Sequence, residues 1–378
     1  MPTLNERMEV YSTDNMLFEM PEIISSSISQ SMEIRPYQRE AFRRFITYFE
    51  KTEIKRYPAQ VLFHMATGSG KTLIMAGLIA YLYKQGYSNF VFFVNSTNII
   101  EKTKQNFLES TSSKYLFADT IMVDGHAVPV KEVQNFSSTD EKAINILFTT
   151  TSKLHRDMNP LLVRENAPTI DDFENKKIVL ISDESHHLNV DTRAGKKLTN
   201  EEMEEKESWE TTVTRIFNAN RENVLLEFTA TCDTENEFIK AKYNDKLIYD
   251  YPLKNFRIDK YSKEVKVFQS DTENFDRSLL AILLSQYRLK LFQKYGLRIK
   301  PVVMFKSKTI NESKSFYEEF QSKLAALTGV DIEKLLTNGN VNNEPVVVKM
   351  TEFFSSTGVN YDALADEIKM DFNEEHCV

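Results

Sequence analysis

The chain has 378 residues, which is enough for two domains that each bury a core. Its hydrophobic share of 41% and charged share of 27% are ordinary for a folded globular protein and exclude a disordered or fibrous chain. The net charge of −8 excludes a general attraction to nucleic acid, so any such contact needs a local patch.

Nothing in the sequence indicates a membrane span, a secretion leader or a disulfide framework. No stretch reaches the ~18 apolar residues of a membrane helix, and the first thirty residues have no apolar leader core. The two cysteines, Cys232 and Cys377, have no zinc-ligand spacing and fit a reducing compartment. We therefore expect a cytoplasmic protein with no membrane partner.

Residues 1–32 show weak periodicity and are predicted to be an N-terminal extension. From Pro36, apolar residues recur at helical spacing and predict an amphipathic helix. Helices are also predicted near 73–83 and 99–108. Short apolar runs between such segments predict strands at Val61–Phe63, Phe90–Val94, Ile144–Phe148, Ile178–Ser182 and Val224–Phe228. This alternation predicts an α/β fold with a parallel sheet and helices on both faces.

The alternation stops around Asp250–Lys266, and there we place a domain boundary. Beyond it, the sequence predicts a helix over about 275–295 and a strand at Val302–Phe305. We expect a first domain over 33–258, followed by a linker and a partial second domain over 259–378.

The strongest motif is Met65-Ala66-Thr67-Gly68-Ser69-Gly70-Lys71-Thr72, between a predicted strand and a predicted helix. In a phosphate-binding loop, backbone N–H groups and the helix N-terminus surround the phosphates. Lys71 would reach the β and γ phosphates of ATP, and Thr72 would bind Mg²⁺. Met65 replaces the first glycine of the general pattern. The alternative is a glycine-rich turn followed by a chance Gly-Lys-Thr.

A second motif, Asp183-Glu184-Ser185-His186, follows an apolar strand. Ligands of open parallel sheets bind at the carboxyl ends of the strands. Asp183 is our candidate for holding Mg²⁺ and Glu184 for activating the attacking water. His186 is expected to hydrogen-bond across the site and to link hydrolysis to movement, and a zinc site is rejected for lack of ligands at suitable spacing. The alternative is a solvated loop after the strand.

A third segment, Thr229-Ala230-Thr231, also follows a predicted strand. Its alternative interpretation is ordinary filling by β-branched side chains. Together with Arg35-Pro36-Tyr37-Gln38 and the two motifs above, it resembles the superfamily 2 helicases and translocases. Several further segments, over about Ile34 to the C-terminus, are similar to the restriction subunit of type III restriction enzymes: 93–95, 100–107, 208–210 and 304–310.

The resemblance implies a RecA-like ATPase domain that uses ATP and Mg²⁺ to move on duplex DNA. It also implies a DNA methyltransferase subunit as a candidate partner. Gln38, with Tyr37 beside it, would face the adenine, and Thr229 and Thr231 would couple nucleotide state to nucleic acid.

The resemblance also places phosphate-backbone contacts after the second and third strands, at Asn95, Ser96, Thr150 and Thr151. Short polar side chains and backbone amides suit such contacts without reading sequence. Helix capping is the alternative role of these residues.

Two family features have no match: the arginine-finger pattern Gln-x-x-Gly-Arg and a nuclease signature. Arg288 and Arg298 flank the first strand predicted for the partial domain, which is the wrong position for a finger. The alternatives to a DNA motor are an RNA helicase and a nucleotide-gated module that binds nucleic acid with little ATPase activity.

Overall fold

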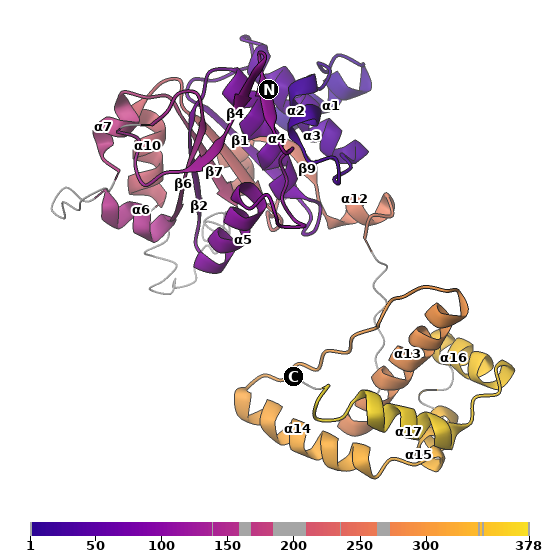
Figure 1. Ribbon diagram of the computed structural model, residues 1–378. Helices are drawn as coiled ribbons and strands as arrows, with labels where there is room; N and C mark the ends of the chain where they lie inside the picture. Colours follow the sequence, from indigo (N-terminus) through magenta and orange to yellow (C-terminus); the bar gives the residue numbers. More distant parts are fainter. Residues whose placement is uncertain are drawn as a thin grey trace. The chain divides into compact units, whose positions relative to one another are not determined.

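The computed structural model describes residues 2–137, 139–158, 168–183, 209–234, 236–262, 273–338, 341 and 344–376. The chain divides into two compact units, Met1–Glu264 and Val265–Val378. Figure 1 shows that the described strands all belong to the first unit. None of the described helices is long and apolar enough to span a membrane.

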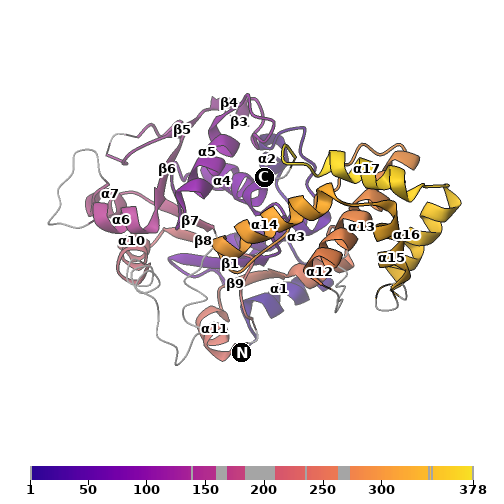
Figure 2. The same cartoon turned by 90° about the horizontal axis from the view of Figure 1, so that it is seen from below.

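The first unit is built on a seven-stranded sheet in the order β5-β6-β2-β7-β8-β1-β9. Every neighbouring pair is parallel, and Figure 2 labels the strands of the sheet other than β2 in this order. A separate antiparallel pair is formed by β3 (Ile121–Val123) and β4 (His126–Val128). The strands of the sheet are β1 (Ala59–Met65), β2 (Asn89–Val94), β5 (Val130–Glu132), β6 (Ile144–Thr150), β7 (Ile178–Asp183), β8 (Val224–Thr229) and β9 (Leu247–Tyr251).

The predicted parallel sheet is confirmed, and its five predicted strands correspond to β1, β2, β6, β7 and β8. Each has almost no solvent-exposed residue, because helices cover both faces and both sets of alternating side chains are buried. Sequence reasoning missed β9, β5 and the β3–β4 pair, which are short or lie at an edge.

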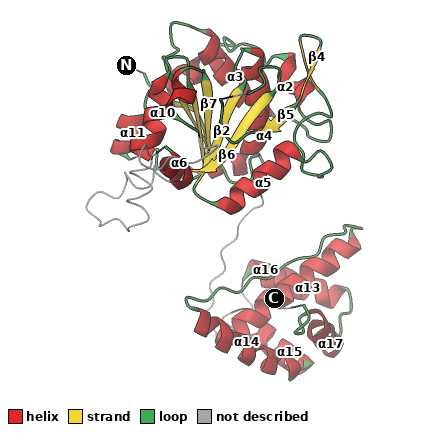
Figure 3. Cartoon of the chain, turned by 60° about the vertical axis from the view of Figure 1, so that its left-hand side comes forward, coloured by secondary structure: helices red, strands yellow, loops and turns green. Residues whose placement is uncertain are grey.

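The alternation of side chains along the strands separates two cores. Phe63, Phe92 and Phe228 belong to the core on one face, where Phe63 and Phe228 stack with ring centroids 4.8 Å apart. Phe93 and Leu180 belong to the core on the other face. Figure 3 shows the sheet enclosed between these helical layers.

The helices α1 to α5, with α12, contribute to the first core, whereas α6, α7 and α10 contribute to the second. The predicted helices at 36, 73 and 99 are confirmed as α3, α4 and α5. The helices of this unit are α1 (Leu4–Thr13), α2 (Glu22–Ser27), α3 (Pro36–Glu50), α4 (Lys71–Lys84), α5 (Thr97–Leu108), α6 (Thr151–Asp157), α7 (Ile170–Glu174), the π-helix η1 (Trp209–Val213), α10 (Thr214–Ala219), α11 (Glu237–Tyr243) and α12 (Leu253–Ile258).

The described part of the second unit is helical. The predicted helix over about 275–295 is confirmed as α13 (Asn274–Lys294). The other helices are α14 (Ile310–Ala325), α15 (Gly329–Thr337), α16 (Pro345–Ser356) and α17 (Tyr361–Asp371), and they share one core.

The strand predicted at Val302–Phe305 is wrong. The segment carries no secondary structure, and Val302 and Met304 are 89% and 84% exposed. An apolar run becomes a strand only where another strand supplies hydrogen-bonding partners, and the described residues of this unit supply none. The assignment of 259–378 as a linker and partial RecA-like domain stays a prediction.

Candidate nucleotide-binding site

The predicted phosphate loop connects the end of β1 to the first turn of α4. Gly68 and Gly70 have φ values of 79° and 78°, in the left-handed region that side chains with a Cβ rarely adopt. A Cβ at Gly70 would also lie 2.4 Å from Nε2 of Gln38. The loop conformation therefore requires glycine at position 70 for two independent reasons.

Lys71 and Ser69 have the contacts expected of a loop that can receive an anion. Nζ of Lys71 donates to the carbonyl oxygens of Met65 and Ala66, at 3.3 and 3.4 Å, so its ammonium group folds back over the loop. Ser69 is 1% exposed, and among the described residues its Oγ has no hydrogen-bond partner. An unpaired buried hydroxyl is costly, and a phosphate oxygen or a ligand water would satisfy it. Thr67 and Gly68 are exposed, and Thr72 is partly exposed in the first turn of α4.

Tyr37 and Gln38, at the start of α3, are hydrogen-bonded to the backbone of the phosphate loop. The Tyr37 hydroxyl and Nε2 of Gln38 both donate to the carbonyl oxygen of Ser69, each at 2.9 Å. Oε1 of Gln38 accepts from the backbone N–H of Arg35, at 3.0 Å, which fixes the amide orientation. Both side chains are buried. The predicted contact of Gln38 with adenine stays a prediction, and the structure places its amide on the loop backbone.

An aromatic cluster that sequence reasoning missed supports Tyr37. Its ring stacks on Tyr251 at the end of β9, with centroids 4.7 Å apart and an interplanar angle of 11°. The edges of Phe256 and Tyr261 complete the enclosure. Burial raises the pKa of Tyr37 above its ordinary value, so its hydroxyl remains a proton donor to Ser69 at neutral pH. The available signal in the sequence was the pair Tyr249 and Tyr251 just before Pro252.

The remaining predicted groups lie along the same edge of the sheet. Because β7, β8 and β1 are neighbours in register, Asp183 is level with Phe228 and Phe63. Two strand spacings then put the backbone of Asp183 about 10 Å from that of β1. This separation leaves room for a phosphate group and a hydrated metal ion between Asp183 and the loop.

Thr229 ends β8, directly between these two elements, and Thr231 follows it. The backbone N–H of Thr231 donates to Oγ1 of Thr229 at 3.2 Å. Thr229 is buried, whereas Thr231 is exposed. This turn therefore lies between the end of β7 and the end of β1, and the predicted coupling role of Thr229 and Thr231 stays a prediction.

Glu184 and His186 lie outside the described residues, and their predicted roles stay predictions. Among the residues that the structure does describe, no three His, Cys, Asp or Glu side chains are grouped to hold a metal by themselves. A magnesium ion at this edge would therefore need the phosphates and water as ligands, together with Thr72 and Asp183.

The four predicted phosphate-backbone contacts lie together where β2 and β6 end side by side. Oγ1 of Thr151 donates to Oδ1 of Asn95 at 3.0 Å, so the two segments are hydrogen-bonded. Thr150 is the N-cap of α6, and its side chain accepts from the backbone N–H of Lys153. Ser96 precedes α5 without a capping bond from its side chain. Thr150 and Thr151 therefore have structural contacts, and Asn95 is the most exposed of the set.

A parallel sheet with a phosphate loop after β1 and an acidic strand end beside it defines a RecA-like domain of the helicase-like class. Comparison with known proteins identifies the family. The family described as "Type III restriction enzyme, res subunit" matches residues 31–234. The "Probable type III restriction-modification enzyme HindVIP Res subunit" of Haemophilus influenzae is 34% identical over 403 residues, covering 98% of this chain and 76% of that protein. The chain belongs to the family of type III restriction enzyme Res subunits.

Solved structures are more distant from this chain. The Sulfolobus solfataricus SWI2/SNF2 ATPase core in complex with dsDNA is 14% identical, with a TM-score of 0.34, over 61% of this chain and 38% of that one. The Pyrococcus furiosus Hef helicase domain is 14% identical, with a TM-score of 0.33, over 86% of this chain and 68% of that one. The chain thus spans well under half the length of the first structure.

Proposed function

We propose that this chain is the ATP-binding motor portion of a type III restriction enzyme, and that it couples ATP hydrolysis on Mg²⁺ to movement on duplex DNA. One observation carries the proposal: three motifs lie at the same edge of the sheet. They are the phosphate loop after β1, Thr229–Thr231 at the end of β8 and Asp183 at the end of β7.

Each group has a defined role in this proposal. Lys71 exchanges the carbonyls of its own loop for phosphate oxygens, and Ser69 gains a partner for its buried hydroxyl. Thr72 and Asp183 hold the metal, which neutralises charge on the phosphates, and Glu184 orients the attacking water. Thr229 and Thr231 link the nucleotide state, that is ATP bound or hydrolysed, to the segments at the ends of β2 and β6.

The nucleic-acid surface in this proposal is formed by Asn95, Ser96, Thr150 and Thr151. Asn95 and Ser96 follow β2, which adjoins β7 in the strand order, and Thr150 and Thr151 lie at the end of β6, the next strand beyond β2. The nucleic acid and the nucleotide would thus contact the same edge of the sheet. Movement along DNA needs nothing more sequence-specific than backbone contacts. A DNA methyltransferase subunit would supply recognition of a site.

The test is a thermodynamic coupling measurement, because coupling is detectable even when turnover is slow. A non-hydrolysable ATP analogue should change the affinity of the chain for duplex DNA, and duplex DNA should change the affinity for the analogue by the same factor. Lys71→Ala should abolish the nucleotide effect on DNA affinity. The same measurement with a matched RNA duplex distinguishes an RNA helicase, whose affinity for RNA would respond to the analogue instead. If the analogue binds but changes the affinity for neither duplex, a motor of either kind is refuted.

A further inference from the structure

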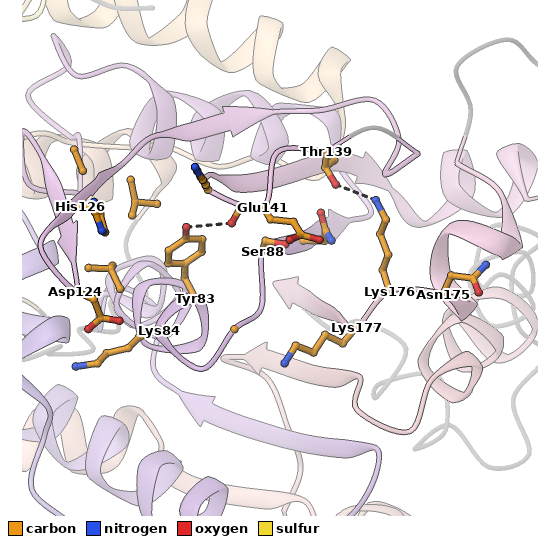
Figure 4. A pocket seen from close by; sticks show the side chains of 16 residues that line it. Tyr83, Lys84, Ser88, Asp124, His126, Thr139, Glu141, Asn175, Lys176 and Lys177 are labelled. Atoms are coloured by element: carbon orange, nitrogen blue, oxygen red, sulfur yellow. Dashed lines mark hydrogen bonds between the residues drawn. The ribbon is translucent and has the colours of Figure 1, made fainter.

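A second cavity lies at the opposite edge of the sheet from the phosphate loop. Its volume is about 790 Å³, and its walls include the segments that precede β2, β6 and β7, the C-terminal end of α4 and the β3–β4 pair. Figure 4 shows the side chains that line it. The six residues of β2 separate the two edges by roughly 20 Å, so this cavity is distinct from the nucleotide site.

Four lysines from three separate segments line the cavity: Lys84, Lys142, Lys176 and Lys177. None of them forms an ion pair with a described carboxylate. Nζ of Lys176 bonds to the Phe136 carbonyl and to Oγ1 of Thr139, at 3.2 Å for the hydroxyl. Nζ of Lys177 lies over the ring of Tyr87, 4.6 Å from its centroid. In a protein with a net charge of −8, four cations at one cavity, none in an ion pair with a described carboxylate, form a local patch of positive charge.

Nearby acidic groups reduce this positive charge but do not cancel it. Asp124 and Glu141 also line the cavity. Asp140 lies just before Glu141 in the sequence. Its carboxylate is bound to Nζ of Lys131 at 2.9 Å and accepts from the backbone N–H of Lys142, also at 2.9 Å, and these contacts hold the pKa of Asp140 below its usual range. Lys84 has a partial structural explanation, because a cation is favoured at the C-terminal end of a helix. Lys142 is exposed in the turn before β6, and the Asp140 carboxylate offsets part of its charge.

We propose that this cavity binds the polyphosphate group of a small molecule. Its volume is in the range of about 300–1,000 Å³ that is typical of small-ligand sites. Figure 4 shows Lys84, Lys176 and Lys177 apart from one another along the wall. A chain of phosphates carries oxygens along its length and can reach more than one of these ammonium groups, and charge-assisted hydrogen bonds are the strong ones. Ser88 and Asn175 add neutral hydrogen-bonding groups to the wall. A concave site suits a small anion better than the convex surface of a duplex.

The experiment uses the full chain with Lys71→Ala, so that the phosphate loop contributes little anion binding. Inorganic tripolyphosphate is titrated by calorimetry at low salt. Lys84→Gln with Lys142→Gln removes two exposed charges whose ammonium groups form no hydrogen bond or ion pair with a described residue, so the fold should be kept. We expect this pair to weaken tripolyphosphate binding about tenfold or more. The matched control is Lys102→Gln with Lys114→Gln, two exposed lysines of the same unit away from the cavity, and it should leave binding unchanged.

Three results would overturn the proposal. The Lys71→Ala chain could bind no tripolyphosphate, or the control pair could weaken binding as much as the cavity pair, which would indicate general charge attraction. The cavity pair could also reduce affinity for duplex DNA and leave tripolyphosphate binding intact, which would assign the lysines to nucleic acid. Separate titrations of the same chain with ADP and with pyrophosphate show whether the ligand is a nucleotide or an inorganic polyphosphate. Tighter binding of ADP than of pyrophosphate would show that the cavity holds a nucleoside as well.

Discussion

Replacement of Tyr37 by Phe deletes one hydrogen-bond donor from the back of the phosphate loop and leaves the packing in place. The ring stacks on Tyr251 and meets the edges of Phe256 and Tyr261, and all of these contacts survive the change. Only the 2.9 Å bond to the Ser69 carbonyl, and the weaker 3.4 Å contact from Nη1 of Arg35, are lost.

The expected magnitude is set by the second donor on that carbonyl. Gln38 still satisfies the Ser69 oxygen, so the loss falls at the low end of the usual hydrogen-bond range, about 0.5–1 kcal/mol. A loop that is less firmly held spends less time in the binding-competent conformation, which lowers apparent affinity by the same factor. ATP should therefore bind about two- to five-fold more weakly to Tyr37→Phe.

The double variant is the sharper test. In Tyr37→Phe with Gln38→Ala, the buried Ser69 carbonyl has neither donor, and an unsatisfied buried group costs a further ~1–3 kcal/mol. The loss of ATP affinity should thus exceed the sum of the single losses. Tyr48→Phe is the control, because it removes a buried hydroxyl that contacts Arg56, remote from the loop. Fluorescent ATP titrations, with denaturant unfolding in parallel, measure both effects. Unchanged ATP affinity in Tyr37→Phe together with strict additivity in the double variant would refute the argument.

Four further predictions concern the chemistry. Lys71→Ala should remove most ATP affinity without unfolding the chain, and equal affinity by titration would contradict the phosphate-loop assignment. Glu184→Gln should bind Mg-ATP normally but lose turnover, because the amide keeps the size and removes the group that activates water; wild-type hydrolysis at saturating ATP would disprove this role. Asp183→Asn should raise the Mg²⁺ concentration needed for half-maximal ATP binding, and an unchanged metal titration would count against metal binding by Asp183. The purified 378-residue chain should hydrolyse ATP slowly, because an arginine finger raises turnover by ~10³–10⁵-fold in P-loop enzymes and neither Arg288 nor Arg298 matches its motif. Strong stimulation by duplex DNA in a steady-state assay would show that another group supplies this function.

Local sequence signals predicted much of the first unit. Each central strand is a short apolar run, and a helix-period pattern follows β1 and β2, so burial on both faces was evident from the residues themselves. The glycines at 68 and 70 marked the phosphate loop, because their positive φ values are a local backbone requirement. The same reasoning failed at Val302–Phe305, where the apolar run was present but no described strand pairs with it.

The tertiary structure decided how these pieces meet. Strand order depends on pairing between distant segments, and only that order places Thr229 between the phosphate loop and Asp183. The bond from Tyr37 to Ser69 joins residues 32 positions apart, and the ring that supports it comes from β9, whose tyrosines stand out in the sequence without revealing what they pack against. The cavity lined by Lys84, Lys142, Lys176 and Lys177 is likewise formed by residues from separate segments at the amino ends of parallel strands. A sequence specifies which residues must be buried and which backbone angles are needed locally, whereas the contacts between distant segments exist only once the sheet has assembled.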